Sequence, residues 1–419
     1  MNLITVAVIG CGNRGQCYTE LILKKPEKFK VTAICDTSKT QLQNIKSLYS
    51  FEADEFLDED EFFKEKRADL LIISSPDRNH VRQAVAAMRL GYDLLLEKPI
   101  SDSREELDAL LNTQKETGKT VMVCHVLRYG AGYRKCKEIL DSGVLGRLYS
   151  IDSSERVVYW HWAQAYVRGI WASLEKSLPA ILAKCSHDLD LLQYYADSEC
   201  DTLSSIGELG FFNRENAPKD STDRCIDCPH IDTCPYSAKR IYIDRWIEQG
   251  RPRFMWPFYR ACSTDPITEE GLYEGIRTGD FGRCAYKCPV DMVDHQFIQM
   301  QFKNGVKASH KMVFGALPGR RIVFYCTLGE LVFDERDDSI TVMPFGKEPE
   351  VIGINAIIEG GHTHGGGDSQ LVDELYGMLI CENEVVTSLS RSVECHLMGI
   401  AADESRKLNG EIVKVHKEI

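Results

Sequence analysis

The sequence predicts an α/β fold whose N-terminal part is a doubly wound parallel sheet. Three observations support this prediction: apolar strand-like runs alternate with helical patterns, a glycine-rich turn follows the first run, and an acidic residue ends the second. A chain of 419 residues is long enough for two domains that each bury a core. We expect the domains to cover residues 1–127 and 128–419.

The first strand, turn and helix have a dinucleotide-binding pattern. The apolar run from Leu3 to Ile9 ends at the sequence GCGNRG, and a helical segment follows. The first glycine allows a tight turn, the second lets the backbone approach a pyrophosphate, and the third lets the helix pack against the strand. The helix N-terminus offers unpaired N–H groups to phosphate oxygens. The predicted cofactor-binding residues of this turn are Gly10, Gly12, Asn13, Arg14 and Gly15.

Asp36 ends the second strand-like run, about twenty residues after the turn. A carboxylate at this position accepts hydrogen bonds from the ribose hydroxyls and repels a 2′-phosphate. The predicted cofactor is therefore NAD rather than NADP. An ordinary tight turn in an α/β protein is the alternative.

The alternation continues to the end of the first domain. Helical patterns cover residues 38–49, 80–90 and 103–117, with Ser103 as N-cap, and apolar runs cover 68–76, 93–97 and 120–125. Ligands bind at the carboxyl ends of the strands in such a sheet. The residues at these ends, which we expect to line the cofactor crevice, are Ser75, Pro76, Glu97, Lys98 and His125.

Several of these motifs together resemble the glucose-fructose oxidoreductase/inositol dehydrogenase/MocA family. They are the turn at residues 10–15, Asp36, the Glu97-Lys98-Pro99 segment and the sequence HVLRY at 125–129. The resemblance implies an N-terminal Rossmann domain and a C-terminal α+β domain with a large, open, mostly antiparallel sheet. It also implies a nicotinamide enzyme that acts on a sugar or cyclitol, assembled as a homodimer or homotetramer.

The second half of the chain supports an antiparallel sheet. Strand-like stretches occur at residues 149–158, 290–302, 306–314, 320–328 and 330–333. Helical patterns follow at 369–381 and 390–408, and we expect the C-terminal helix to pack back on the first domain.

Lys98 and His187 are the predicted catalytic residues. A lysine at a strand end can donate to the reacting hydroxyl and stabilise a developing alkoxide, and the matching lysine of the family contacts that hydroxyl. His187 matches the family's general acid/base on a helix. The family's aspartate, four residues earlier, is Ala183 in this sequence. Lys184 or Asp188 would take over part of its role, so Lys184 is the third catalytic candidate.

Aromatic and polar residues suggest a platform for a sugar. Flat ring faces suit the C–H groups of a sugar, and imidazole and guanidinium donors suit its hydroxyls. The predicted substrate-binding residues are Tyr166, Arg168, His161 and, in a glycine-rich loop, His364. Core packing of the rings is the alternative, and metal binding by His362 and His364 is a further one.

An insertion at about residues 213–290 is rich in cysteine. The spacing C-x2-C-x5-C followed by C-x3-C suits thiolate ligation of a metal that staples a loop-rich segment without a core. The predicted ligands are Cys225, Cys228, Cys234 and Cys288, with Cys284 as competitor for the fourth position. Zinc is the favoured metal, and an iron–sulfur cluster or free thiols are the alternatives.

Charge and cysteine content limit the class of protein. The formal net charge is −13 and no basic block occurs, which argues against nucleic acid or an anionic membrane as partner. The N-terminal apolar run is too short for a membrane span and lacks a basic region before it. Sixteen cysteines without an export signal favour a cytoplasmic protein.

Three functions fit these patterns. The first is an NAD-dependent oxidoreductase acting on a secondary hydroxyl of a sugar, glycoside or inositol. The second is an NAD-dependent glycosidase or lyase that uses transient sugar oxidation, elimination and re-reduction. The third is a non-catalytic, NAD-bound regulatory protein, against which the presence of both Lys98 and His187 argues.

Overall fold

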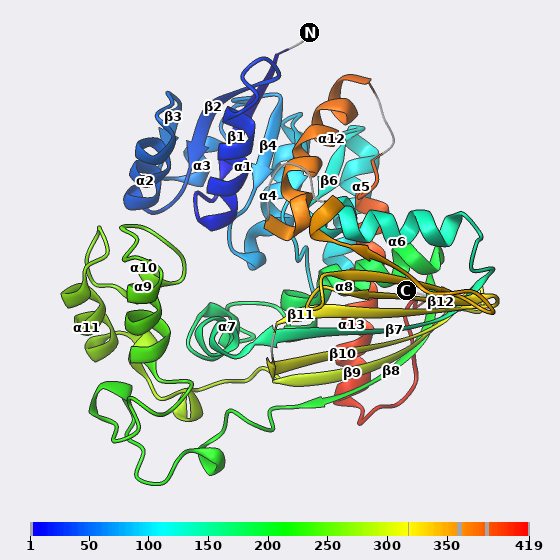
Figure 1. Ribbon diagram of the computed structural model, residues 1–419. Coiled ribbons are helices and arrows are strands. Elements are labelled where there is room, and N and C mark those ends of the chain that lie inside the picture. The colour runs from blue at the N-terminus through cyan, green and yellow to red at the C-terminus, as the bar shows by residue number, and fades with distance from the viewer. Residues whose placement is uncertain (1–2, 317, 358–362, 382–384, 418–419) are drawn as a thin grey trace.

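The N-terminal domain contains the predicted parallel sheet. The computed structural model describes residues 3–316, 318–357, 363–381 and 385–417 (Figure 1). All strand pairs of the first sheet are parallel, in the order β3-β2-β1-β4-β5-β6. The strand order reverses between β1 and β4, which places a ligand crevice at their carboxyl ends. The strands are β1 (Ile4–Ile9), β2 (Phe29–Cys35), β3 (Asp54–Phe56), β4 (Leu70–Ile73), β5 (Asp93–Leu96) and β6 (Val121–Val123).

Helices cover both faces of this sheet. The helices α1 (Asn13–Leu23) and α2 (Lys39–Tyr49) share one apolar core with α12 (Gly367–Cys381), the helix before the C-terminal one. The helices α4 (His80–Arg89) and α5 (Arg104–Thr117) belong to the core on the other face. Ser103 caps α5, because its side chain accepts a hydrogen bond from the Glu106 N–H. Burial on both faces explains why the run at β4 is continuously apolar.

The second domain contains the large sheet, in the order β14-β13-β12-β11-β7-β10-β9-β8-β15. Of its described strand pairs, β7–β10 is parallel and the others are antiparallel, so the predicted architecture is confirmed. The strands β8, β13 and β14 were not predicted from the sequence. The strands are β7 (Leu148–Val158), β8 (Cys200–Glu208), β9 (His295–Phe302), β10 (Lys307–Ala316), β11 (Gly319–Cys326), β12 (Gly329–Asp334), β13 (Ser339–Pro344), β14 (Glu350–Gly353) and β15 (Val413–Lys414).

The helices α6 (Ala131–Asp141), α8 (Ala180–Ala196) and α13 (Leu389–Lys407) pack against this sheet (Figure 1). The segment before α13 also reaches the first domain. The Val123 N–H donates to the Thr387 carbonyl over 2.9 Å, and Met122 and Ser388 form an isolated bridge. C-terminal residues therefore complete the β6 edge of the first sheet.

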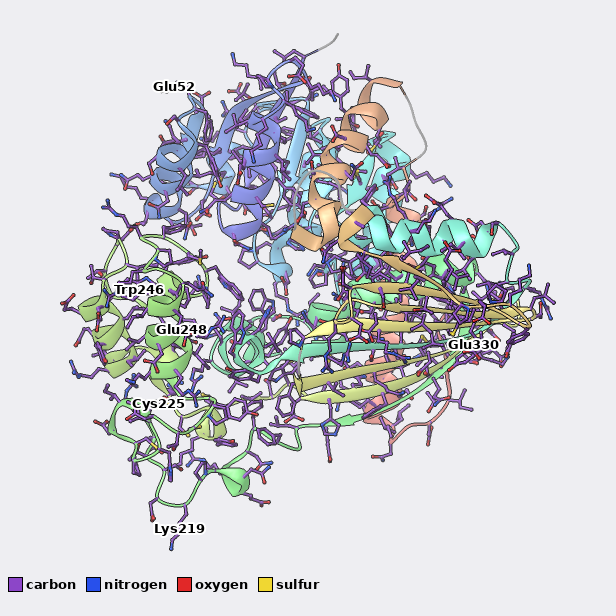
Figure 2. The ribbon with its side chains drawn as sticks, viewed as in Figure 1. Glu52, Lys219, Cys225, Trp246, Glu248 and Glu330 are labelled. Carbon is purple, nitrogen blue, oxygen red and sulfur yellow. The ribbon has the colours of Figure 1, made fainter. Side chains whose placement is uncertain are left out.

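The cysteine-rich insertion lies between β8 and β9. Figure 2 shows Cys225, Trp246 and Glu248 in it, away from Glu330 in the large sheet. The expectation that this segment lacks a core is wrong. Its helices α9 (Arg245–Glu248), α10 (Phe258–Ala261) and α11 (Glu269–Thr278) bury a separate apolar cluster. The spaced apolar residues of that cluster include Ile241, Tyr242, Trp246, Phe258, Leu272 and Ile276.

None of the helices in the described part of the chain is both long and apolar enough to span a bilayer.

Candidate active site

The glycine turn between β1 and α1 has one glycine that packing does not explain. Gly10 has φ +88°, and a Cβ there would lie 2.4 Å from the Ser75 nitrogen. A Cβ on Gly15 would lie 2.1 Å from the Gly10 oxygen. A Cβ on Gly12 would meet nothing within 4 Å. Because no side chain caps α1 at Gly12, the open space and the first N–H groups of the helix fit a dinucleotide phosphate.

Asp36 is fixed beside this turn at the carboxyl end of β2. One carboxylate oxygen accepts from the Cys11 N–H and the other from the Ser38 N–H, both over 2.8 Å. These two hydrogen bonds orient the carboxylate. Both donors are backbone N–H groups, so neither contact neutralises its negative charge. This arrangement fits recognition of a ribose with free hydroxyls.

An Asp36→Asn variant is expected to bind NAD about tenfold to a hundredfold more weakly, because hydrogen bonds to a charged acceptor contribute about 1.5–3 kcal/mol. The preference for NAD over NADP should narrow as well, since the charge that repels a 2′-phosphate is removed. Titration of both nucleotides against the variant measures the two affinities. Glu52→Gln, at an exposed position of the same domain, is the control. An unchanged NAD affinity in the Asp36 variant would contradict the assignment.

Glu97 anchors the loop that carries Lys98. Its buried carboxylate accepts from Arg14 Nε over 2.7 Å, from Tyr18 Oη over 2.8 Å and from the Lys98 N–H over 3.0 Å. Arg14 also donates to Asp368 of α12 over 2.6 Å. The structure thus places Arg14 and Glu97 in a mutual ion pair beneath the turn. Their contact with a cofactor stays a prediction, as does that of Asn13, which begins α1.

Two histidines hold the main chain around Lys98. The His80 ring nitrogens lie 2.7 Å from the Pro99 oxygen and 2.9 Å from the Ser75 oxygen. His80 therefore ties the loop after β5 to the Ser75-Pro76 loop after β4. His396 of α13 accepts from the Ile100 N–H over 2.8 Å. Neither histidine was identified from the sequence, because nothing in the local patterns points to these distant carbonyl and N–H partners.

The half-buried Lys98 side chain is directed toward a group of charged residues. Burial lowers the pKa of Lys98, Glu97 and Asp77 act to raise it, and the nearby Lys184 lowers it further, with a lowered pKa as the result. Within the described residues, the Lys98 ammonium group makes no hydrogen bond or ion pair. Asp77 is itself held by Trp171 Nε1 over 3.2 Å and by Ser177 Oγ over 3.0 Å.

The helix α8 brings Lys184 and His187 to the same region. Lys184 forms an ion pair of 3.0 Å with Glu155 of β7. Asp188 pairs with Arg320 of β11 over 2.8 Å. Arg320 engages both carboxylate oxygens of Asp188, and a role of Asp188 in orienting His187 stays a prediction.

A cavity of about 370 Å³ opens beside these residues. Burial alone would raise the pKa of Glu155, but Arg320 and Lys184 lower it to about 2, so the carboxylate stays charged. Burial, followed by Lys184, lowers the pKa of His161 to about 3, so this imidazole is neutral near pH 7. The described lining residues are Glu155, Arg156, Val157, Val158, His161, Lys184, Pro318, Gly319, Arg320 and Glu335.

Glu155 and Arg320 were missed in the sequence analysis. Glu155 alternates in phase with the buried residues Ile151 and Val157 of β7. A glutamate in the buried phase of a strand is the signal that could have identified it, since such a carboxylate needs a charged partner. Its partner Arg320 lies far away in the sequence and has no comparable local signal.

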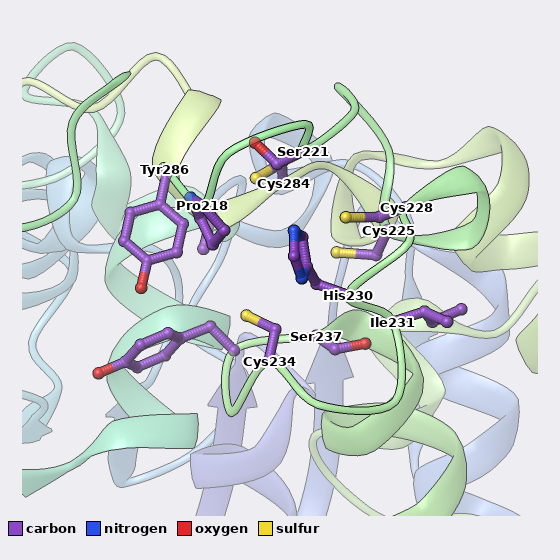
Figure 3. A pocket seen from close by; sticks show the side chains of 12 residues that line it. Pro218, Ser221, Cys225, Cys228, His230, Ile231, Cys234, Ser237, Cys284 and Tyr286 are labelled. Atoms are coloured by element: carbon purple, nitrogen blue, oxygen red, sulfur yellow. The ribbon is translucent and has the colours of Figure 1, made fainter. Parts of the chain in front are cut away.

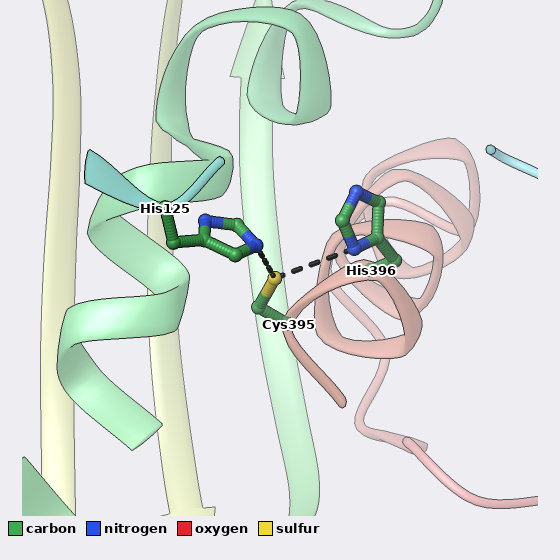
Figure 4. Close-up of side chains that lie close together, drawn as sticks. All are labelled: His125, Cys395 and His396. Atoms are coloured by element: carbon green, nitrogen blue, oxygen red, sulfur yellow. Dashed lines mark hydrogen bonds between the residues drawn. The ribbon is translucent and has the colours of Figure 1, made fainter. Parts of the chain in front are cut away.

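His125 lies fully buried behind His187, with their rings edge-on at 5.7 Å. Its Nε2 is 3.5 Å from the Cys395 sulfur, which also contacts His396 (Figure 4). The three side chains are close enough to hold a metal ion, but His396 has no free lone pair. Its Nδ1 lies 2.7 Å from the Ser392 oxygen and its Nε2 accepts from Ile100. This cluster therefore connects α13 to the first domain and is no metal site.

The stability of the protein is expected to fall as the pH decreases from 6.5 to 4.5. Burial, followed by His125, lowers the pKa of His396 from 6.5 to about 3. In this window the unfolded chain binds a proton that folded His396 does not, so acid favours unfolding by about 1.4 kcal/mol per pH unit for such a group. Urea unfolding at several pH values measures the slope. His396→Gln should reduce the slope, and a free energy of unfolding that is flat over this range would contradict the assignment.

The predicted substrate residues occupy different places. His161 lines the cavity, whereas Tyr166 is buried and stacks on Trp162 at 4.5 Å. Arg168 points into the cysteine-rich insertion, where it donates to the carbonyl oxygens of Arg283 and Tyr236. Its place as a substrate residue is therefore not supported. The His364 side chain and all of His362 lie outside the described part of the chain.

Comparison with known proteins identifies the first domain. Residues 4–125 match the model of an oxidoreductase family with an NAD-binding Rossmann fold. This domain belongs to the Gfo/Idh/MocA family. The match agrees with the glycine turn, Asp36 and the Lys98 loop, so the predicted family and fold class are confirmed, and the chain is an NAD-binding oxidoreductase.

Relatives of the chain extend the comparison over the second domain. Oxidoreductase YteT of Bacillus subtilis is 22% identical over 391 residues, which cover 88% of each chain. Inositol 2-dehydrogenase of Salmonella paratyphi B is 25% identical, over 34% of this chain and 43% of its own. A solved levoglucosan dehydrogenase, in complex with NADH and levoglucosan, has a TM-score of 0.72 at 15% identity and covers 99% of this chain and 100% of its own. At that identity the structural likeness indicates the fold alone.

Proposed function

We propose that the protein is an NAD-dependent dehydrogenase that acts on a secondary hydroxyl of a sugar, glycoside or inositol. The observation that carries the proposal is the convergence of Lys98, at the carboxyl end of β5, with Lys184 and His161 at the charged cavity. Bound NAD would supply the hydride acceptor. Lys98 would donate a hydrogen bond to the reacting hydroxyl and stabilise the developing alkoxide. His187, on the same helix as Lys184, would accept the proton.

The charged lining of the cavity supports a polyhydroxylated substrate. The Lys184–Glu155–Arg320 group supplies donors and acceptors that are already oriented by one another. The volume of the cavity, about 370 Å³, lies at the lower end of the usual range for ligand pockets and suits a single small ring. The inositol and levoglucosan dehydrogenases named above act on small polyhydroxylated rings, which agrees with this substrate class.

We also propose a cytoplasmic homodimer or homotetramer. The sheet face opposite α8 and α13 carries Phe297, which is 37% exposed, and its cross-strand partner Ile206, which is 58% exposed. An apolar pair on an uncovered sheet face is typical of a subunit interface.

The test is an absorbance scan of the reduced nicotinamide band, with a panel of sugars, inositols and aryl glycosides and with NAD added or withheld. A stoichiometric rise that depends on added NAD would support the dehydrogenase and identify its substrate class. Release of aglycone without net reduction would overturn it in favour of the redox-assisted glycosidase. Bound NAD without any turnover would overturn it in favour of the regulatory protein.

A further inference from the structure

Four cysteines of the insertion line one small cavity, of about 20 Å³ (Figure 3). They are Cys225, Cys228, Cys234 and Cys284. Cys288, which the sequence analysis preferred as fourth ligand, does not line the cavity, and its sulfur lies 3.3 Å from the Cys284 carbonyl oxygen. All five thiols are free of disulfides. The structure therefore favours Cys284 as the fourth member of the set.

Backbone hydrogen bonds fix the four cysteines around this cavity. The Cys228 N–H donates to the Cys225 carbonyl oxygen over 3.2 Å, and the Cys234 N–H donates to the His230 carbonyl oxygen over 2.9 Å. The Cys284 N–H donates to the Asp223 carbonyl oxygen over 2.8 Å, beside an antiparallel bridge between residues 224 and 283. This bridge connects the segment of Cys284 to that of Cys225. Two distant parts of the sequence thus meet at the cavity.

The separation of the sulfur atoms distinguishes a single ion from a cluster. A tetrahedral zinc site with Zn–S bonds of about 2.3 Å places its thiolates about 3.8 Å apart. In the part of the chain that the structure describes, which includes all five cysteines, no three of these sulfurs lie within 4.8 Å of one another. In an iron–sulfur cluster the four thiolates are divided among two or four iron atoms, so no more than two of them share one metal atom. The observed spacing fits more than one metal atom.

Buried donors surround the same cavity. Arg168 Nη2 lies 3.5 Å from the Cys225 sulfur. Arg168 Nη1 and Ser237 Oγ are buried, and neither has a hydrogen-bond partner among the described residues. Arg168 is 6% exposed and Ser237 is 1% exposed, so both donors are without water and need an acceptor. The sulfur atoms of an anionic cluster would accept these hydrogen bonds, and the guanidinium would balance part of the negative charge.

We propose that Cys225, Cys228, Cys234 and Cys284 bind an iron–sulfur cluster, which receives hydrogen bonds from Arg168 and Ser237. The cluster stabilises the fold and takes part in no redox step of the reaction. It joins the two halves of the insertion and, through Arg168, the segment that carries Tyr166 and His161. This inference does not depend on the proposed substrate, because it concerns the metal content of the chain.

The first test is analysis of the intact chain, purified without oxygen from cells grown with added iron. Iron, acid-labile sulfide and zinc are measured per chain, together with the visible charge-transfer absorption of the protein. We expect equal amounts of iron and sulfide, with at least two of each per chain. One zinc without sulfide, or a chain free of metal, would overturn the proposal.

The second test assigns the ligands. Cys284→Ser is expected to lose most of the iron and sulfide, whereas Cys288→Ser and Cys262→Ser keep them. The reverse pattern, with the cluster retained in Cys284→Ser and lost in Cys288→Ser, would overturn the ligand set. Arg168→Lys should retain the iron but alter the absorption spectrum, because Lys presents a different donor geometry. If Cys284→Ser fails to fold, the wild-type metal analysis and the Cys288→Ser result still decide the proposal.

Discussion

Replacing Lys98 by methionine is expected to lower kcat about a hundredfold to a thousandfold, the usual loss when one donor to a developing oxyanion is removed. Methionine keeps most of the side-chain volume but has no ammonium group. The affinity for NAD should change less than threefold, because Gly12 and Asp36, and not Lys98, face the expected phosphate and ribose positions. The same variant therefore separates the chemical step from cofactor binding.

Steady-state assays on the substrate identified by the absorbance scan, with a separate NAD titration, measure these two effects. Lys176→Met, at an exposed position, is the matched control and should leave both quantities unchanged. Because the pKa of Lys98 is lowered, wild-type activity should decrease as the pH rises through that pKa. The residual activity of the variant should not show this decrease. Retained turnover in Lys98→Met, or lost NAD binding, would show that the residue has another role.

Replacing Arg128 by methionine is expected to destabilise the fold by about 3–5 kcal/mol, the cost of leaving one member of a buried ion pair unpaired. Arg128 donates from Nε and Nη2 to both carboxylate oxygens of Asp190, each over 2.7 Å. Their side chains are 2% and 1% exposed. Burial raises the pKa of Asp190 even with Arg128 beside it, so the unpaired carboxylate would be still harder to keep charged.

The urea midpoint, recorded by far-UV circular dichroism, measures this loss. Lys135→Met removes the surface pair with Glu138 and should change stability by less than about 1 kcal/mol. The double variant Arg128→Met/Asp190→Leu should be more stable than Arg128→Met alone, because no unpaired charge remains. Equal midpoints for Arg128→Met and the Lys135 control would contradict the expected role of the pair.

The sequence was informative where function depends on local spacing. The GCGNRG turn, Asp36 and Lys98 each follow a strand directly, so the chain order alone places them at one edge of the first sheet. Alternating apolar residues likewise predict β7 and β10 because one face of each strand is buried. These features depend on residues that are near one another in sequence.

Contacts between distant segments could not be predicted in the same way. His80 and His396 hold the Lys98 loop from other helices, and Arg320 reaches Glu155 across two neighbouring strands. Arg168 is of a residue type that often donates to sugar hydroxyls, but the fold directs its side chain into the insertion. Only the pairing of remote segments decides such side-chain directions, and a single sequence contains no direct record of it.

The contacts of the C-terminal segment have a consequence for biosynthesis. Thr387 and His396 satisfy the N–H groups of Val123 and Ile100, yet they are translated more than 260 residues later. A nascent first domain therefore leaves the ribosome without the Thr387 contact at the edge of β6 and without the His396 contact that holds the Lys98 loop. Closing so long a loop is slow compared with local folding. A working nucleotide site should thus form only after Thr387 and His396 have left the ribosome, and a chain released before that point would depend on chaperones rather than on its cofactor.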